Sequence, residues 1–242
     1  MQRARADNAA AIATIFVNPR QFNEAADYQR YPRNEERDLA ICAEEGLDLV
    51  FAPPVEEVYP PGFDTLVTVG AVARPLEGAA RPGHFDGVAT VVAILFDLVG
   101  ADSAYFGQKD AQQVMVIRQM ARDLAIATEV VSCPTIREPD GLALSSRNVH
   151  LSPAERAAAP VIWRALTNGR ERWAAGERSA DAIRDAMSTT LATDALAEPE
   201  YVSVADGRTL AELETVDGPA LLSVAVRFGT TRLIDNEPIG GD

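Results

Sequence analysis

Short apolar runs alternate with segments of helical periodicity along the first half of the chain. Apolar and β-branched residues predict buried strands at residues 12–17, 47–52, 65–69, 104–106 and 128–133. Helical patterns lie between them at residues 32–45, 87–99 and 109–124. The first of these helices has Asn34 as a candidate N-cap and Gly46 as its stop. This alternation predicts an α/β domain, in which a parallel sheet carries helices on its faces.

The pattern changes after residue 136. A polar loop at residues 137–148 leads into a helix that opens at Ser152 with capping-box spacing, because Glu155 follows three positions later. A second helix is predicted at residues 180–193, and closing strands at 201–204, 221–228 and 231–234. We therefore predict two domains, at residues 1–136 and 137–242, the second a smaller α+β domain. Ligands favour the seam between such domains.

Charge and cysteine content narrow the function classes. The chain carries 22 Lys and Arg against 36 Asp and Glu, a net charge of −14. Such a surface repels a phosphate backbone, which argues against nucleic-acid binding. Cys42 and Cys133 lie far apart and the chain has two histidines, so neither a zinc site nor a disulfide framework is predicted. We expect buried thiols in a reducing cytoplasm.

The apolar run at residues 9–17 follows two arginines and superficially resembles a secretory signal. It continues directly into Asn18 without a small-residue cleavage site, so a buried strand is the better interpretation. Elsewhere in the sequence, no apolar stretch reaches the length that a membrane-spanning helix needs. We therefore expect no membrane partner.

One candidate phosphate site follows the strand at residues 104–106. Gly107, Gln108, Lys109 and Asp110 lead from this strand into a helix. Free backbone N–H groups, the positive end of the helix and the Lys109 ammonium would then meet at the carboxyl edge of a parallel sheet, where anions bind. The alternative is an ordinary strand-to-helix turn with a surface lysine.

A second candidate lies in the polar loop. Ser145, Ser146 and Arg147 combine adjacent hydroxyls with a fixed positive charge, which suits triphosphate oxygens and the charge that develops as pyrophosphate departs. The alternative is a solvated loop with a helix cap.

Amide side chains offer a third candidate. Asn18 and Gln21 follow the first strand, and Gln112 and Gln113 lie on the first turn of the helix after Lys109. Amides donate and accept at once, which suits a small ligand with hydroxyls and a carboxylate. One glutamine of the pair is expected to face the pocket and the other to be solvated.

Arg81 and His84 add a cation and an imidazole in one loop. They could serve a site, although a single histidine is more often structural.

Together these segments resemble the pantoate–β-alanine ligase family, the pantothenate synthetases. The matching segments, in order, are FVNPRQF, DYQRYPR, RPGHFDGVATVV, AYFGQKDAQQ, VIRQM, PTIREPDGLALSSRN, LSPAERAAA and FGTTRLIDN. The resemblance implies a Rossmann-like parallel sheet of the nucleotidylyltransferase type with a smaller α+β C-terminal domain, in a cytoplasmic homodimer. It also implies that Mg²⁺ and ATP support condensation of pantoate with β-alanine through a pantoyl adenylate, with release of pyrophosphate and AMP.

The resemblance assigns roles to individual residues. Gln21 and Gln113 correspond to the amides that hold pantoate, with Asn18 beside them. The stretch from Gly107 to Asp110 corresponds to a nucleotide-binding segment, in which Lys109 contacts phosphate. Ile136 and Leu144 correspond to adenine contacts, and Ser145, Ser146 and Arg147 to the mobile triphosphate loop. Arg81 and His84 match a loop near the active site, and the metal ligands are not identified.

Simple chemistry agrees with these roles. The substrate carboxylate is itself the nucleophile of an adenylation, so the site must orient it and stabilise charge at phosphorus. Lys109 and Arg147 can supply that charge. Because the adenylate is a reactive anhydride, closure of the small domain over the site should also exclude water.

The resemblance departs from the family pattern at the front. The family's first strand and its HxGH motif, whose histidines bind ATP phosphates, have no counterpart in this sequence. One hypothesis is that the start codon lies upstream and that the ligase is intact. Another is that the chain binds nucleotide or pantoate without catalysis, and a third is a different nucleotidyltransferase on the same fold.

Overall fold

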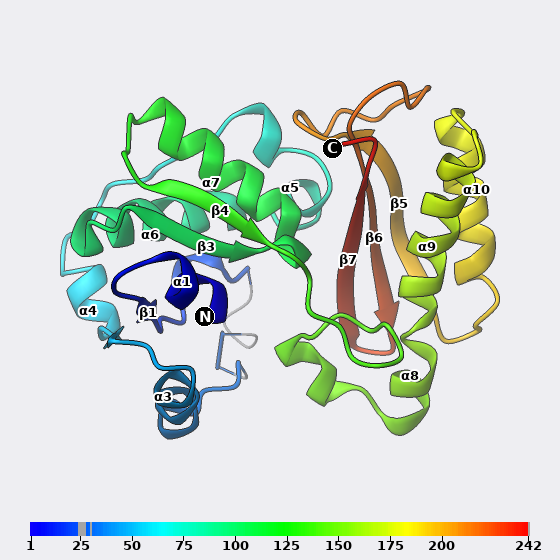
Figure 1. Cartoon of the computed structure of the whole chain (residues 1–242). Coiled ribbons are helices and arrows are strands. Elements are labelled where there is room, and N and C mark those ends of the chain that lie inside the picture. Colours follow the sequence, from blue (N-terminus) through cyan, green and yellow to red (C-terminus); the bar gives the residue numbers. More distant parts are fainter. Residues whose placement is uncertain (24–27, 30, 242) are drawn as a thin grey trace. The chain divides into compact units, whose positions relative to one another are not determined.

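A computed structural model describes residues 1–23, 28–29 and 31–241, which form two compact units (Figure 1). Unit 1 comprises Met1–Phe106 and Gln112–Cys133, so far as these are described. Unit 2 comprises Gly107–Ala111 and the chain from Pro134 onward. The motif DYQRYPR lies partly outside the described residues.

Unit 1 mixes short strands with helices. Its strands are β1 Ile12–Thr14, β2 Leu49–Phe51, β3 Ser103–Gly107, whose last residue already groups with unit 2, and β4 Glu129–Cys133. Its α-helices are α1 Gln2–Asp7, α3 Glu35–Glu44, α4 Val55–Val58, α5 Glu77–Ala80, α6 His84–Val99 and α7 Ala111–Asp123. Short 3-10 turns occur at η1 Pro19–Gln21 and η2 Ala71–Ala73.

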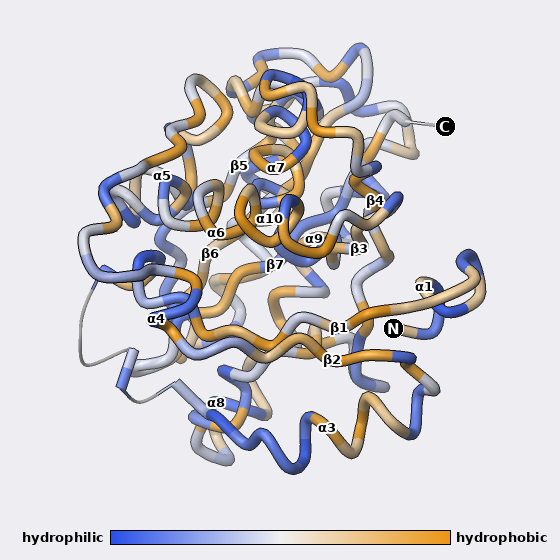
Figure 2. The backbone as a smooth tube through the Cα atoms, turned by 90° about the vertical axis from the view of Figure 1, so that its left-hand side faces the viewer, coloured by the Kyte–Doolittle hydropathy of each residue, from blue (hydrophilic) through white to orange (hydrophobic). Residues whose placement is uncertain are grey.

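The strands of unit 1 form two separate pairs. β1 pairs in parallel with β2, from Ile12 opposite Leu49 to Thr14 opposite Phe51, and the two strands run side by side in Figure 2. β3 pairs with β4, and both arrows point the same way in Figure 1. The predicted strands at 12–17, 47–52, 104–106 and 128–133 are therefore confirmed in place, although most are shorter or shifted at their ends.

The strand predicted at residues 65–69 is wrong, because this segment has no regular structure. Val67 donates its backbone N–H to the Thr90 side chain on α6 at 2.9 Å. The Thr90 hydroxyl is therefore the acceptor for a backbone N–H that a neighbouring strand would otherwise bind.

The helix α6 supplies the core of unit 1. Val88, Ala89 and Val91 are buried on it. It begins at His84, three residues before the predicted start, so Gly87 lies inside the helix. A Cβ atom on Gly87 would lie 2.3 Å from the Arg20 carbonyl oxygen. The glycine therefore allows the backbone of η1 to approach the helix closely.

Unit 2 is a three-stranded antiparallel sheet packed against helices. Its strands are β5 Glu198–Asp206, β6 Ala220–Phe228 and β7 Thr231–Ile239, with β6 in the middle. Its helices are α8 Pro153–Ala158, α9 Val161–Ala174 and α10 Ala180–Leu191, and its 3-10 turns are η3 Gln108–Asp110 and η4 Ser146–His150. The three predicted closing strands are confirmed, and apolar side chains from β6, α9 and α10 share one core.

The predicted capping box is present, because Ser152 N–H donates to Glu155 Oε2 at 2.7 Å and Glu155 N–H donates to Ser152 Oγ at 3.4 Å. Pro160 interrupts the helix and separates α8 from α9, since proline offers no backbone N–H. Among the residues described, no helix is both long and apolar enough to cross a bilayer.

Candidate active site

Asn18 is a buried residue after β1 whose side chain connects several segments of unit 1. Its Nδ2 donates to the Gly87 carbonyl at 3.0 Å and to Gln21 Oε1 at 3.3 Å. Its Oδ1 accepts from the Arg20 N–H at 3.1 Å and from the Tyr59 hydroxyl at 2.9 Å. Burial raises the pKa of Tyr59 to about 12, against the opposing effect of the Arg20 charge, so the hydroxyl stays a donor at neutral pH. All four hydrogen-bonding positions of Asn18 are thus engaged, and its side chain orients Gln21.

Arg81 and His84 hold the backbone of Gln21. His84 Nδ1 lies 2.8 Å from the Gln21 carbonyl oxygen, and Arg81 donates to the same oxygen at 3.2 Å. The second ring nitrogen of His84, Nε2, lies 3.2 Å from the Arg81 guanidinium. A carbonyl only accepts and a guanidinium only donates, so this geometry requires a neutral imidazole with its proton on Nδ1. His84 therefore positions Gln21.

The two glutamines on α7 differ in their surroundings, and Gln112, for which a solvated position was the alternative, is buried. Gln112 donates to the carbonyls of Val72 at 3.0 Å and Pro75 at 2.8 Å, and accepts from the Glu77 N–H at 3.0 Å. It fastens the loop between η2 and α5. Gln113 is partly exposed, and its side chain makes no hydrogen bond to the described residues. Its amide is available to a ligand.

Asn236 fixes the candidate phosphate stretch within unit 2. Its side-chain Nδ2 donates to the carbonyls of Gln108 and Lys109, both at 2.9 Å, and its Oδ1 accepts from Gln108 Nε2 at 3.1 Å. Asn236 is 4% exposed. The η3 turn is therefore attached to β7, while the Lys109 ammonium forms an ion pair with Asp110 at 3.7 Å.

An ion pair between Arg137 and Asp235 lies next to Asn236. Arg137 contacts Asp235 through two nitrogens, at 2.5 and 3.1 Å, and Asp235 also accepts from the Asn236 N–H at 2.8 Å. The Arg137 guanidinium stacks 3.7 Å from the centre of the Trp163 ring. This network anchors the start of the predicted polar loop to β7.

The predicted polar loop is a hairpin. Arg137 bridges Ala143 across it, and Leu144 N–H donates to the Ile136 carbonyl at 2.9 Å. The Ile136 and Leu144 side chains are 66% and 51% exposed. Two large apolar side chains thus lie exposed on facing positions of one hairpin, as contacts with a flat ring would require.

The triplet Ser145, Ser146 and Arg147 follows the hairpin. Ser145 Oγ accepts from the Arg147 N–H at 3.2 Å and so caps η4. This is the helix-cap alternative that the sequence also allowed. Ser146 is exposed, and Arg147 forms no ion pair with any described carboxylate. Both η3 and η4 pack against β7. Unit 2 therefore brings Lys109 and Arg147 onto segments carried by one strand.

A metal site made by protein side chains is not found in the described part of the chain, where no group of three or more His, Cys, Asp or Glu residues is placed to hold an ion. Cys42 is buried and Cys133 is partly buried, and both are free thiols.

Several residues with positioning roles were not predicted from the sequence. Asn236, Asp235, Tyr59 and Gln112 all bond to residues at least 35 positions away. The one signal for the first two is an Asp-Asn pair in an apolar C-terminal strand, where buried polar groups need partners.

The parallel strand pairs, the separate antiparallel sheet and the cationic segments after β3 and after the hairpin define an α/β protein of the nucleotidylyltransferase type. A family model described as pantoate-beta-alanine ligase matches residues 1–238. The chain belongs to the pantoate–β-alanine ligase family.

Individual relatives agree with this membership. The pantothenate synthetase of Roseiflexus sp. (strain RS-1) is 60% identical over 236 residues, which cover 98% of this chain and 85% of the relative. A crystal structure of pantothenate synthetase from Thermus thermophilus is 50% identical, with a TM-score of 0.94, over 98% of this chain and 86% of that one. The pantoate-beta-alanine ligase of Francisella tularensis, complexed with beta-gamma ATP and beta-alanine, is 34% identical, with a TM-score of 0.78, over 98% and 82%.

Proposed function

We propose that this protein condenses pantoate with β-alanine to give pantothenate, using ATP and releasing AMP and pyrophosphate. The support is family membership over residues 1–238 together with a site that offers positive charge and side-chain amides. ATP is a substrate, and the Francisella relative is complexed with beta-gamma ATP and beta-alanine.

The observation that carries the proposal is the placement of Lys109 and Arg147. Both cations lie on short turns packed against β7. Lys109 pairs with the half-exposed carboxylate of Asp110 at 3.7 Å, and Arg147 has no ion pair within the described residues. In a chain of net charge −14, two such cations mark a site for an anion. We assign them to the phosphates of ATP, where they stabilise the charge that develops as pyrophosphate leaves.

Gly107 supports the same assignment. Its φ is −74°, which any residue adopts, and a Cβ atom there would meet nothing within 4 Å. The fold itself therefore places no demand for glycine at this position. A ligand that approaches the backbone closely would impose one.

The remaining assignments follow the chemistry of the side chains. Gln21 and Gln113 hold pantoate through their amides, with Asn18 orienting Gln21. Ile136 and Leu144 contact adenine, and Ser145 and Ser146 donate to phosphate oxygens beside Arg147. Mg²⁺ enters with the ATP phosphates, since this ion is usually bound by phosphates and few protein ligands. We further propose a cytoplasmic homodimer.

The reaction then proceeds in two displacements. A pantoate carboxylate oxygen attacks the α-phosphorus of ATP, and the bond from that phosphorus to the departing pyrophosphate breaks. The neutral amine of β-alanine next attacks the acyl carbon, the carbon–oxygen bond to AMP breaks, and the nitrogen loses a proton to solvent. The protein orients the reactants and stabilises charge in both steps.

Labelled pantoate tests this route. With ¹⁸O in the pantoate carboxylate, one labelled oxygen should appear in AMP, and pyrophosphate should form only when pantoate is present. Production of ADP and phosphate, or of unlabelled AMP, would contradict the adenylate. ATP binding without any turnover would instead support the alternative of a binding protein on this fold.

A further inference from the structure

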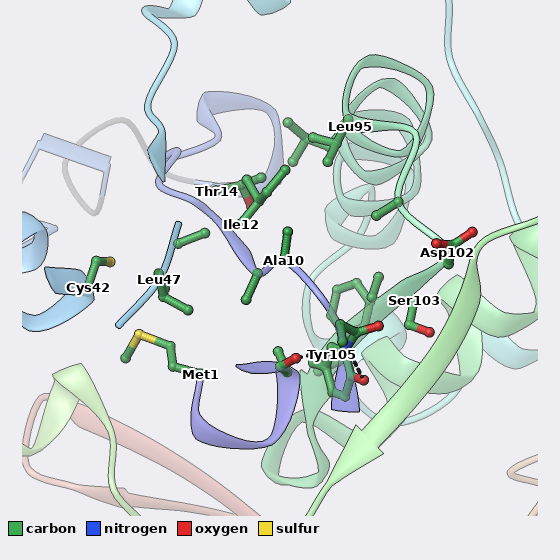
Figure 3. A pocket seen from close by; sticks show the side chains of 18 of the residues that line it. Met1, Ala10, Ile12, Thr14, Cys42, Leu47, Leu95, Asp102, Ser103 and Tyr105 are labelled. Carbon is green, nitrogen blue, oxygen red and sulfur yellow. Dashed lines mark hydrogen bonds between the residues drawn. The ribbon is translucent and has the colours of Figure 1, made fainter. Parts of the chain in front are cut away.

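The residues assigned to adenine lie on a hairpin of unit 2. The cavity of unit 1 drawn in Figure 3 has a volume of about 790 Å³, and none of the candidate site residues lines it. Ile136 and Leu144 lie instead at the two ends of residues 136–144, where Arg137 bridges Ala143. We call this segment the 136–144 hairpin. The position of a bound adenine ring therefore depends on what holds this hairpin in place.

The 136–144 hairpin has two faces. The Arg137 side chain points to Trp163 on α9, with its guanidinium carbon 3.7 Å from the centre of the ring. Side chains alternate along paired strands, so Ile136 lies on the face opposite to Arg137. Leu144 lies on the same face as Ile136, because the two residues pair through the Leu144 N–H and the Ile136 carbonyl. The exposed apolar pair is therefore turned away from Trp163.

Trp163 contacts the hairpin at a second position, Gly141. This glycine has a φ of 92°, and a Cβ atom on it would lie 2.0 Å from Trp163 Cδ1. The Gly141 backbone thus lies directly against the indole ring, which leaves no room for a side chain. Arg137 donates to the Gly141 carbonyl at 3.1 Å, so the two residues that contact the ring are also bonded to each other. A single ring supports both the start and the turn of the hairpin.

The ring supplies something that the other partners of Arg137 do not. The hydrogen bonds from Arg137 to Asp235 and to the Gly141 carbonyl are made at the edge of the planar guanidinium. They fix where the guanidinium lies but leave its faces open. Trp163 covers one face, where packing and cation–π attraction act together. Trp163 therefore fixes the tilt of the guanidinium, and through it the tilt of the hairpin.

Trp163 is itself held in place within unit 2. It is partly buried and packs against the core that β6, α9 and α10 share. Arg170 of α9 lies 5.6 Å from the centre of the same ring and pairs with Glu237 of β7 at 2.7 Å. The Trp163 indole N–H makes no hydrogen bond to the described residues. Trp163 thus acts on the hairpin through the faces of its ring.

We propose that Trp163 is a positioning residue for the adenine ring of ATP and acts through the 136–144 hairpin. It holds Arg137 and Gly141 on one face, so that Ile136 and Leu144 form a fixed apolar surface on the other. Contacts to adenine are the same in the bound substrate and in the transition state, so they set the affinity for ATP more than the rate of the chemical step. This role rests on the proposed function, which assigns ATP to the hairpin.

Binding measurements on the full chain separate the base from the phosphates. The two probes are ATP and inorganic tripolyphosphate, which has the phosphates without the base, and titration calorimetry gives both values of Kd. In Trp163→Ala the Kd for ATP should rise about tenfold, the size expected for loss of a partly buried cation–π contact. The Kd for tripolyphosphate should not change. In turnover assays, KM for ATP should rise much more than kcat falls.

Three further variants control this measurement. Trp163→Phe keeps a ring face and loses only an N–H without a partner, so it should keep most of the affinity for ATP. Trp163→Leu fills the same space without an aromatic face, should weaken ATP binding, and replaces Trp163→Ala if that variant does not fold. Trp173→Ala is the matched control, because Trp173 lies on the same helix, packs against the same core and has Arg178 at 5.3 Å from its ring centre. It should leave the Kd for ATP unchanged.

Amide hydrogen exchange shows the movement of the hairpin without any nucleotide. The Leu144 N–H donates to the Ile136 carbonyl at 2.9 Å, and the Gly141 N–H donates to the Glu138 carbonyl at 2.9 Å. Both amides should exchange faster in Trp163→Ala than in the parent protein. Their rates in Trp163→Phe and in Trp173→Ala should stay close to those of the parent.

The outcomes distinguish this role from a general structural one. Equal losses of affinity for ATP and tripolyphosphate in Trp163→Ala, or equal effects of Trp163→Ala and Trp173→Ala, would overturn the positioning role. Unchanged affinity for ATP in folded Trp163→Ala or Trp163→Leu would overturn it as well. A parent protein that binds no ATP would refute the proposed function and this role with it. A parent that binds ATP, with no selective effect in the variants, would refute the role of Trp163 alone.

Discussion

Asn236 should control catalysis through the backbone of Lys109. The Asn236→Ala change removes two donors at 2.9 Å from the Gln108 and Lys109 carbonyls, and one acceptor at 3.1 Å from Gln108 Nε2. Asn236 is 4% exposed and the three hydrogen bonds are partly buried. At roughly 1 kcal/mol for each lost hydrogen bond, the free energy of unfolding should fall by up to about 3 kcal/mol.

The fall in kcat should be larger than the loss of folding stability alone would cause. Release of η3 from β7 displaces the Lys109 ammonium, and a shift of about 1 Å in a positioned group can cost about 10²-fold in rate. Asn236→Asp should reduce kcat at least as much, because a carboxylate places a negative oxygen against the two carbonyls that Asn236 donates to. We expect kcat for pyrophosphate release to fall more than KM for pantoate rises.

The matched control is Asn168→Ala, also in unit 2. Asn168 donates to the Ala186 carbonyl at 3.3 Å and to Thr190 Oγ1 at 2.9 Å, so its loss also removes partly buried hydrogen bonds. Urea unfolding gives the stability of each variant, and pyrophosphate release is measured where each is fully folded. Equal kcat for Asn236→Ala and Asn168→Ala would refute the positioning role.

Three other predictions concern the same segments. Lys109→Ala and Arg147→Ala should each slow pyrophosphate release by about 10²-fold, and an unchanged rate in both would remove them from the phosphate site. Gly107→Ala should leave the melting temperature unchanged and raise KM for ATP. Gly87→Ala should lower the melting temperature, because its Cβ would lie 2.3 Å from the Arg20 carbonyl oxygen. Equal melting temperatures of the two variants would contradict both assignments. Hydrogen bonding from Arg156 lowers the pKa of Asp140 below its usual 3.8, so the stabilisation is present above pH 4 and is lost as pH falls through the folded-state pKa. Between pH 5 and about pH 2, the urea midpoint should therefore drop less in Asp140→Asn than in the parent protein. Parallel curves for the two proteins would show that the Asp140–Arg156 pair does not contribute to stability.

Local signals were enough to predict much of the fold. Asn34 accepts from the Arg37 N–H and Gly46 has a φ of 69°, so the cap and stop that the sequence showed are where the helix begins and ends. The capping box at Ser152 and the strands around β6 are equally local. Each of these features depends on residues within a few positions of one another.

The features that the sequence did not show depend on distant partners. Residues 65–69 have β-branched character, yet the backbone N–H of Val67 bonds to the Thr90 side chain on α6. The backbone of η1 lies against Gly87 of α6, and the Asn236 side chain bonds to residues 127 and 128 positions away. Propensity and periodicity carry no information on such contacts, because the partners meet only after the chain folds.

The site residues divide in the same way. Lys109 and Arg147 could be proposed from the sequence, because their charges follow a predicted strand and lie in a polar loop, respectively. The roles of Asn18 and His84 could not, since only the contacts show that their side chains are spent on holding Gln21.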